Sequence, residues 1–533
     1  MKHKLEDQEA LLSVQTGIKP RMKTPNDNLA LVSLLLILIF TSGFYGLLIL
    51  RDGLPVVLLI LLALLWALHI YTDRIRILPT PLDAPMLALL VSLAVNLTFS
   101  VDRQSTLVRA YHLALSFSLF FAIVRLVQFR KDLPITIVCL LLLSLGAGIL
   151  GLFATDWSGG VLGFLSPVYV KLPRLASIVP GASINKNTMG GALTFFPPLL
   201  LSLFWDGSAF KKLARKYPGY NKLPIWFYKL LVLLCLALVL AVIILTQSRG
   251  AWLGAAVGLY VFLVWKDKRF LWAIPTGILF LMVISQKTGI SSLAEFFALL
   301  DRGQDASLQG RLDIWQRIIS LTRDFPVTGV GLDALNPVYQ SFFNPFLFDE
   351  PPARLYHAHN TLLSVTIEMG IPALILYVAM LTTFAAMAKR AFRGARRINK
   401  VLIMGLVCGM LAHQVFGLMD AYPLGKNLGI IMWIYFAVIT ALYIHRGRMI
   451  RSFPQQQDEK ASPPVGDLLG QILFGLALWL MLSLIALALV RVNIYLSLLA
   501  AILAGVFLGV VSVKSPVFMK ARKKTITNAI NNG

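Results

Sequence analysis

The sequence predicts an all-α polytopic membrane protein with about 12–14 transmembrane helices and a large helical extracytoplasmic loop. Of its 533 residues, 57% are hydrophobic and only 14% are charged, whereas about a quarter of a soluble domain is charged. Several apolar runs reach the roughly 18–20 residues that a helix needs to cross a bilayer, and none alternates as membrane barrel strands do. We expect spans at 29–50, 54–71, 84–99, 107–126, 133–153, 186–205, 227–246, 250–265, 270–285, 358–387, 401–419, 427–445, 468–489 and 493–513.

The basic residues predict the orientation of these spans. If the N-terminus is cytoplasmic, most of the 49 Lys and Arg residues fall on the cytoplasmic side, including "KRAFRGARRINK" at 389–400 and "RGRMIR" at 446–451. The positive-inside rule favours this arrangement. The net charge of +24 is therefore explained by topology and by attraction to anionic membrane lipid, and nucleic acid is not expected as a partner.

Polar segments divide the chain. The N-terminal segment does not resemble a cleaved signal peptide, because its first apolar run is too long. The cysteines Cys139, Cys235 and Cys408 all lie in apolar runs, so we expect neither a disulfide framework nor a metal site.

The expected parts of the chain are a cytoplasmic tail (1–28), nine transmembrane helices (29–285), an extracytoplasmic loop (286–357), transmembrane helices ten to twelve (358–445), a cytoplasmic linker (446–467), an additional transmembrane hairpin (468–513) and a basic cytoplasmic tail (514–533).

The long outer loop contains one predicted amphipathic helix. The stretch "SLQGRLDIWQRIISLTRDF" at 307–325 carries an apolar face at helical spacing. We expect this helix to lie on or over the membrane domain. Its predicted apolar face contains Leu308, Leu312, Trp315, Ile318, Ile319 and Thr322, and the predicted polar faces contain Arg311, Asp313, Gln316 and Arg317.

Polar groups from separate segments fall on the same predicted outer face: Arg174, Arg249, Arg311, His357 and His359. A charge at membrane depth indicates a functional site. A guanidinium binds two phosphate oxygens at once, and an imidazole can accept a proton from a hydroxyl. The set predicts group transfer from a lipid-linked diphosphate to an acceptor hydroxyl, with His359 as the base and the arginines stabilising the leaving phosphate.

Each of these residues also has a structural interpretation. His359 or Asn360 could cap the helix expected to begin at 358. Arg174 and Arg249 could reach lipid phosphate from the ends of their spans, and Arg311 could lie on a solvated face. We treat Asp420 as an orienting residue at most.

Five ordered pieces make the chain resemble the bacterial O-antigen ligase and O-antigen polymerase family. They are "RLASIVPGASINKNTMGGAL" (174–193), "SRGAW" (248–252), "GRLDIW" (310–315), "TGVGL" (328–332) and "HAHNTLLSVTIEMGIPAL" (357–374). The resemblance implies a GT-C-like glycosyltransferase that uses no metal or cofactor. It would move a glycan from undecaprenyl diphosphate to a lipid or glycan acceptor. It implies catalytic roles for Arg249, Arg311 and His359, and we expect Arg174, Asn187, His357 and Asn360 to contact substrate.

The resemblance leaves the acceptor open. A ligase and a polymerase need the same residues, so both remain. A small-anion transporter is disfavoured because we find neither an internal repeat nor the broken midplane helices typical of transporters. The expected location is the bacterial cytoplasmic membrane, with the site facing the periplasm or the cell exterior.

Overall fold

The structure, a computed structural model, is built from helices. It describes residues 32, 36–37, 56–73, 80–130, 133–157, 166–172, 183–207, 210–211, 224–277, 308–339, 357–421, 424–425, 428–451 and 465–514. Within these ranges eight helices are long and apolar enough to cross a membrane, and three shorter apolar helices accompany them. The prediction of an all-α polytopic membrane protein is confirmed. Most of the predicted span 29–50 and the end of the predicted span 270–285 lie outside the described residues.

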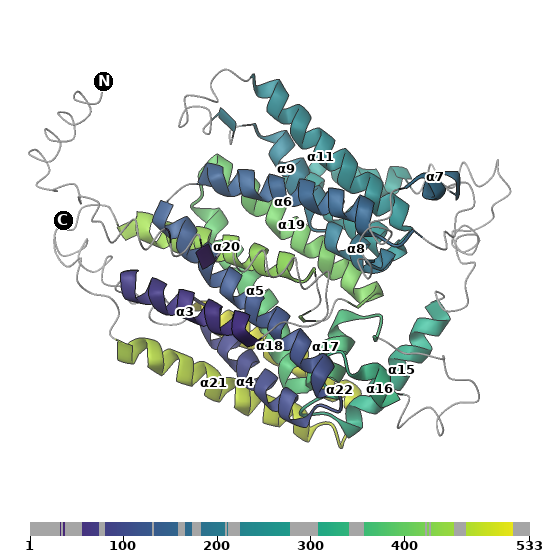
Figure 1. Ribbon diagram of the computed structural model, residues 1–533, viewed down its shortest axis with the longest axis vertical. Helices are drawn as coiled ribbons and strands as arrows, with labels where there is room; N and C mark the ends of the chain where they lie inside the picture. The colour runs from purple at the N-terminus through teal and green to yellow at the C-terminus, as the bar shows by residue number, and fades with distance from the viewer. Residues whose placement is uncertain are drawn as a thin grey trace, which may run out of the picture.

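The helices keep the order of the predicted spans (Figure 1). They are α3 (Val56–Asp73), α4 (Asp83–Phe99), α5 (Arg103–Arg130), α6 (Leu133–Ala154), α7 (Ser166–Lys171), α8 (Lys186–Leu193), α9 (Phe196–Trp205), α11 (Ile225–Thr246), α12 (Arg249–Lys266), the 3-10 helix η4 (Lys268–Trp272), α15 (Leu308–Asp324), α16 (Leu335–Val338), α17 (Thr361–Met369), α18 (Ile371–Arg393), α19 (Arg397–Met419), α20 (Ile430–Arg451), α21 (Val465–Ala488) and α22 (Ile494–Lys514).

Helix α19 lies at the centre of the bundle and packs closely against α12 and α9. A Cβ at Gly254 of α12 would lie 2.4 Å from the carbonyl oxygen of Ala412, so only glycine allows this approach. A Cβ at Gly409 of α19 would lie 2.3 Å from the Phe195 oxygen. Small residues at such crossings let membrane helices gain van der Waals contact that larger side chains would prevent. The position of α19 is therefore set by close backbone packing on two sides.

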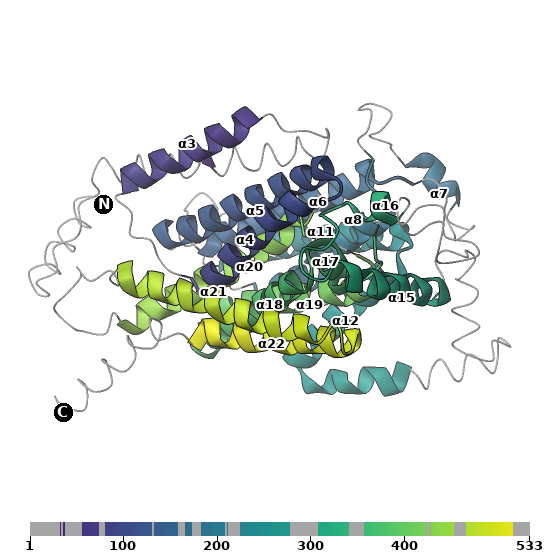
Figure 2. The same ribbon diagram turned by 90° about the horizontal axis from the view of Figure 1, so that it is seen from below.

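One end of the bundle carries the short helices, and arginine contacts join helix ends that the predicted topology places on the other side of the membrane. Figures 1 and 2 show α15, α16 and α17 at the same end as α7. Arg397, at the start of α19, donates to the Asp206 carboxylate after α9 at 2.8 Å. Arg390, in the last turns of α18, donates to the Val513 oxygen of α22 at 2.6 Å. These contacts join the ends of α9, α18, α19 and α22, which the predicted topology places on one side of the membrane.

The span expected over 358–387 is two helices, so that prediction is wrong. α17 ends and α18 begins at Gly370, which has φ of +85°. A Cβ at Gly370 would lie 2.1 Å from the Val327 oxygen, because the loop after α15 passes against the break and the Pro326 oxygen accepts the Ile371 N–H at 2.8 Å. Gly370 followed by Pro372 is a helix-end signal in the sequence, and the prediction of one continuous span overlooked it.

Asn96 of α4 fastens this loop to the end of α17. Its Nδ2 donates to the oxygens of Thr328 and Glu368, both at 2.7 Å. Its Oδ1 accepts the Leu332 N–H at 3.3 Å. The Asn96 side chain is fully buried, and a buried amide with several partners fixes backbone positions because losing any one partner is costly.

The span expected over 186–205 is present as one candidate membrane span, Lys186–Trp205, with an interruption inside it. It consists of α8 and α9, separated at Thr194 and Phe195. The Phe195 oxygen accepts the Tyr435 hydroxyl at 2.7 Å, so another side chain of the bundle satisfies this carbonyl. Thr194 and Phe195 keep right-handed helical dihedral angles, so the backbone is not unwound here. Pro197 and Pro198 follow directly and lack the N–H groups that a continuous helix uses.

Helices α21 and α22 occupy the region of the predicted additional hairpin. α22 packs along α18, and Trp479 of α21 donates through Nε1 to the Pro372 oxygen at 3.1 Å. Outward-facing Leu484 and Leu503 are 68% and 61% exposed, as expected for side chains that face lipid.

The loop helix α15 matches the predicted amphipathic helix in extent, but its burial differs from the predicted faces. Ile318 and Thr322 are buried, whereas Leu312 is 40% exposed. Arg317, expected on a polar face, donates to the Tyr339 hydroxyl at 2.7 Å. The reason is that α15 packs on α17, so a protein surface decides which side is buried.

We expect Gly254→Ala to lower the thermal unfolding midpoint of the detergent-solubilised protein. The new methyl group would push α12 from α19, and overpacking of this kind costs about 1–3 kcal/mol. Gly470→Ala in α21 is the matched control, because a Cβ there meets nothing within 4 Å. Equal midpoints for the two variants would contradict the close packing.

Candidate functional site

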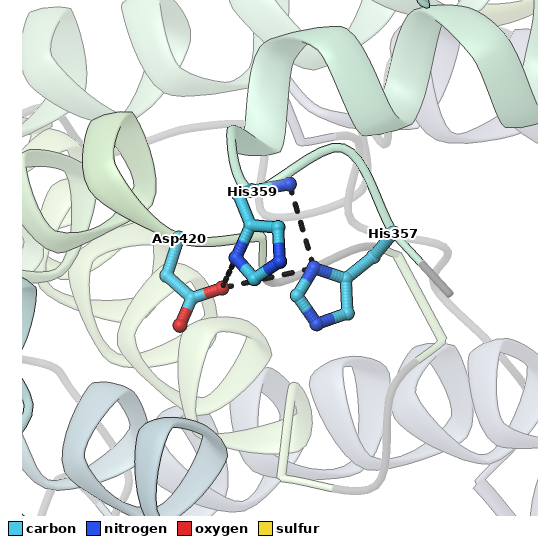
Figure 3. Close-up of side chains that lie close together, drawn as sticks. All are labelled: His357, His359 and Asp420. Atoms are coloured by element: carbon cyan, nitrogen blue, oxygen red, sulfur yellow. Dashed lines mark hydrogen bonds and ion pairs between the residues drawn. The ribbon is translucent and has the colours of Figure 1, made fainter. Parts of the chain in front are cut away.

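Two histidines and one aspartate form a cluster at the end of α19 (Figure 3). Nδ1 of His359 lies 3.2 Å from Oδ1 of Asp420, and Nδ1 of His357 lies 3.7 Å from the same oxygen. The Asp420 side chain is only 5% exposed, while the two imidazoles are 26% and 28% exposed. A buried carboxylate therefore faces two rings that remain partly open to the surroundings.

The backbone at His359 adopts an unusual conformation. Its φ is +47°, in the left-handed region that costs a residue with a side chain about 1–2 kcal/mol. Such strain persists only where the surroundings impose it, and it is concentrated at functional sites. Here the neighbouring Ala358 is fully buried. On the other side, the Thr361 hydroxyl donates to the backbone carbonyl oxygen of Asp420 at 3.4 Å, so the residues on both sides of His359 are held in place.

Asn360 provides the N-cap of α17. Its Oδ1 accepts the Leu363 N–H at 3.1 Å, and its Nδ2 donates to the Leu418 oxygen at 3.3 Å. The helix begins at Thr361, so the helix start expected at 358 is wrong. Asn360, and not His359, therefore caps α17, and the His359 imidazole lies beside Asp420.

Arg249 begins α12 directly after a tight turn. Gln247 in this turn has φ of +52°, and Ser248 caps α12 by accepting the Ala251 N–H at 3.4 Å. The next residue, Gly250, packs on the end of α19, where an added Cβ would lie 3.1 Å from Cβ of Met419. The turn thus brings Gly250, which follows half-buried Arg249, against Met419, the residue that precedes Asp420.

A tyrosine from α7 supports this turn. The Tyr169 hydroxyl donates to the Leu245 oxygen at 2.7 Å and accepts from Nε2 of Gln247 at 2.5 Å. Burial raises the pKa of Tyr169, and the hydrogen bond from Gln247 opposes that rise. The hydroxyl therefore stays protonated near neutral pH and acts as a hydrogen-bonding support.

Arg311 reaches the same place from the loop helix. It lies in the first turns of α15, and its Nη1 is 4.0 Å from Sδ of Met419. Arg311 and Gly250 thus both contact Met419, while His357 and His359 face Asp420. Three segments far apart in the sequence converge on two consecutive residues at the end of α19.

The structure describes Asn187 but not Arg174 among the remaining predicted site residues. Arg174 lies outside the described residues. Asn187 is in the first turn of α8, where its N–H donates to Oδ1 of Asn185 at 2.8 Å. A Cβ at Gly190, one turn later, would lie 3.3 Å from Cβ of Ser248. Asn187 therefore belongs to the helix that packs against the Arg249 turn.

The sequence interpretation underestimated Asp420. Its signal was a single carboxylate directly after a long apolar helix, which alone does not identify a partner. In the structure the ligand atoms of His357, His359 and Asp420 lie within 4.8 Å of one another, a group that could hold a metal ion. Sequence spacing did not reveal this group because its members come from two distant segments.

Comparison with known families agrees with the sequence resemblance. Residues 234–378 match a family model described as O-antigen ligase. The matched segment includes Arg249, Arg311, His357, His359 and Asn360. A search of curated proteins found no match.

We expect cysteines at positions 250 and 419 to form a disulfide in a variant whose three native cysteines are replaced by serine. The Cβ separation of 3.1 Å is slightly shorter than the roughly 3.5–4.5 Å of disulfides, so a small shift suffices. Mass spectrometry after mild oxidation measures the bond. Cysteines at 277 and 419 are the control, since a Cβ at Gly277 meets nothing within 4 Å. Equal crosslinking of both pairs would contradict the placement of the Arg249 turn.

Proposed function

We propose that the protein is a glycosyltransferase acting on undecaprenyl-diphosphate-linked glycan, because residues 234–378 match a family model described as O-antigen ligase. The acceptor is a hydroxyl of a lipid or another glycan. The observation that carries the proposal is the convergence of Arg311, the Arg249 turn and the two histidines on Met419 and Asp420. This arrangement brings anion-binding groups and a proton acceptor to one end of the bundle.

In this proposal His359 removes the proton of the acceptor hydroxyl. Its Nδ1 lies 3.2 Å from Oδ1 of Asp420, so the negative charge of the carboxylate favours a proton on Nδ1 and leaves the lone pair on Nε2. Nε2 takes the hydroxyl proton as the oxygen attacks the anomeric carbon, and the bond from that carbon to the phosphate oxygen breaks. Asp420 acts as a positioning residue that holds the ring and stabilises the imidazolium.

The arginines bind the leaving diphosphate. The bond that breaks leaves negative charge on the diphosphate oxygens, and guanidinium groups already in place stabilise that charge as it develops. Arg311 contacts Met419, and Gly250, the residue after Arg249, packs against the same Met419. In this proposal one diphosphate engages the side chains of both arginines. We assign Arg174, Asn187, His357 and Asn360 to the surrounding substrate contacts.

Transfer is favoured over anion transport despite the broken helix between α8 and α9. In transporters, unwound backbone at such a break coordinates the cargo. Here the Phe195 carbonyl oxygen accepts a hydrogen bond from the Tyr435 hydroxyl at 2.7 Å. That carbonyl is therefore already used inside the helix bundle and does not face a cargo site. The charged groups gather instead at the end of α19.

The proposed location is the bacterial cytoplasmic membrane, with this site on the periplasmic or outer side. Two features support this orientation. The segments richest in Lys and Arg, including 389–400, belong inside by the positive-inside rule. The Arg397–Asp206 contact joins two ends that the topology places on that cytoplasmic side.

We expect His359→Ala to lower transfer by at least about 100-fold, the low end of what a general base contributes. The assay uses purified protein, a lipid-diphosphate glycan and candidate acceptors. An unchanged unfolding midpoint is the control for folding. If this variant turns over at the wild-type rate, His359 is not the base.

We expect Arg249→Lys and Arg311→Lys each to reduce turnover by at least about tenfold, because an ammonium cannot bind two phosphate oxygens as a planar fork does. Arg323→Lys is the matched control, since Arg323 lies exposed near the end of the same helix α15. Full turnover in the first two variants would favour a role in lipid contact, and the diphosphate assignment would fail.

A further inference from the structure

We propose that His357, His359 and Asp420 form a binding site for a divalent transition-metal ion such as Zn²⁺, and that the bound ion inhibits glycan transfer. The inhibition rests on the function proposed above. The binding does not, because it follows from the geometry of the three side chains alone.

The spacing of the donors fits a tetrahedral ion. Zinc bonds of about 2.0–2.1 Å to nitrogen and oxygen place neighbouring donors about 3.3 Å apart. The distances from Oδ1 of Asp420 to the two Nδ1 atoms are 3.2 and 3.7 Å, so small shifts bring all three onto one ion. These protein ligands leave a fourth position for water.

The types of donor determine which ions fit. Two imidazoles and one carboxylate suit borderline ions such as Zn²⁺ and Co²⁺. Mg²⁺ and Ca²⁺ prefer six or more oxygen ligands, and this cluster offers only one carboxylate. The site therefore discriminates against the alkaline-earth ions.

The donors are held in position before any ion binds. Oδ1 of Asp420 accepts the Ala421 N–H at 2.8 Å, which orients the carboxylate. Nδ1 of His357 accepts the His359 N–H at 3.4 Å, so this nitrogen carries a lone pair and not a proton, and an ion would replace this long hydrogen bond. Nδ1 of His359 is buried and, among the described residues, has no aligned hydrogen bond, although Asp420 is 3.2 Å away.

Metal binding and base catalysis compete for the same ring. The proposed base needs its proton on Nδ1 and its lone pair on Nε2. A metal on Nδ1 displaces that proton, and the neutral imidazole then carries its remaining proton on Nε2. His359 therefore cannot accept the acceptor's proton while the ion is bound.

The binding test uses the purified full-length protein after chelator treatment. Titration with Co²⁺ should give the visible absorption of tetrahedral cobalt at one ion per chain, and calorimetry should give the same stoichiometry for Zn²⁺. His357→Gln and Asp420→Asn should each weaken binding at least tenfold. His445→Gln, in α20, is the control and should bind as the wild type does. Absent binding, or binding unaffected by the first two substitutions, overturns the site.

The inhibition test compares transfer with and without Zn²⁺, each variant being normalised to its own metal-free rate. Zinc should abolish wild-type transfer, and His357→Gln should raise the half-inhibitory concentration at least tenfold. EDTA should leave the metal-free rate unchanged. Loss of activity in EDTA, or stimulation by zinc, overturns the inhibitory role. A protein that binds one ion through these residues but transfers no glycan under any condition retains the metal site and refutes the proposed transfer.

Discussion

The contact between the buried Asp420 carboxylate and the imidazoles of His357 and His359 is the interaction on which the site depends. It joins the end of the closely packed helix α19 to the segment that starts α17. Close backbone packing at Gly254 and Gly409 leaves α19 little freedom to shift. The C-terminal end of α19 is therefore held in place. Met419 and Asp420 in turn position the side chains that contact them, which include Arg311 and His359.

The segment that carries His359 is held from its other end as well. The loop after α15 crosses the break at Gly370, and Asn96 ties that loop to the end of α17. With both ends fixed, the left-handed backbone of His359 is maintained despite its steric cost. The packing of α15, the loop after it and α17 thus fixes Arg311 and His359 relative to each other. This explains why Arg311 contacts Met419 while His359 faces the next residue, Asp420.

The apolar runs were sufficient to predict the helical membrane class and most of the spans, because lipid forces backbone groups into helices. Arg249, Arg311 and His359 were identified by being polar at the ends of apolar runs. Arg311 contacts Met419 and His359 faces Asp420, whereas the roles assigned to these residues stay predictions. The break at Gly370 was signalled by Gly370 and Pro372 but was overlooked, because the surrounding residues are apolar. Two features were beyond a one-dimensional pattern. Asp420 needs a partner distant in the chain, and the exposure of Leu312 follows from the packing of α15 on α17.

An experimental structure of the protein with a lipid-linked diphosphate bound tests the central claim most directly. The account predicts diphosphate oxygens within hydrogen-bond distance of the guanidinium groups of Arg249 and Arg311. It also predicts that Nδ1 of His359 remains on Asp420, with Nε2 open to the acceptor. A diphosphate bound elsewhere, or a His359 ring turned away from Asp420, would contradict it.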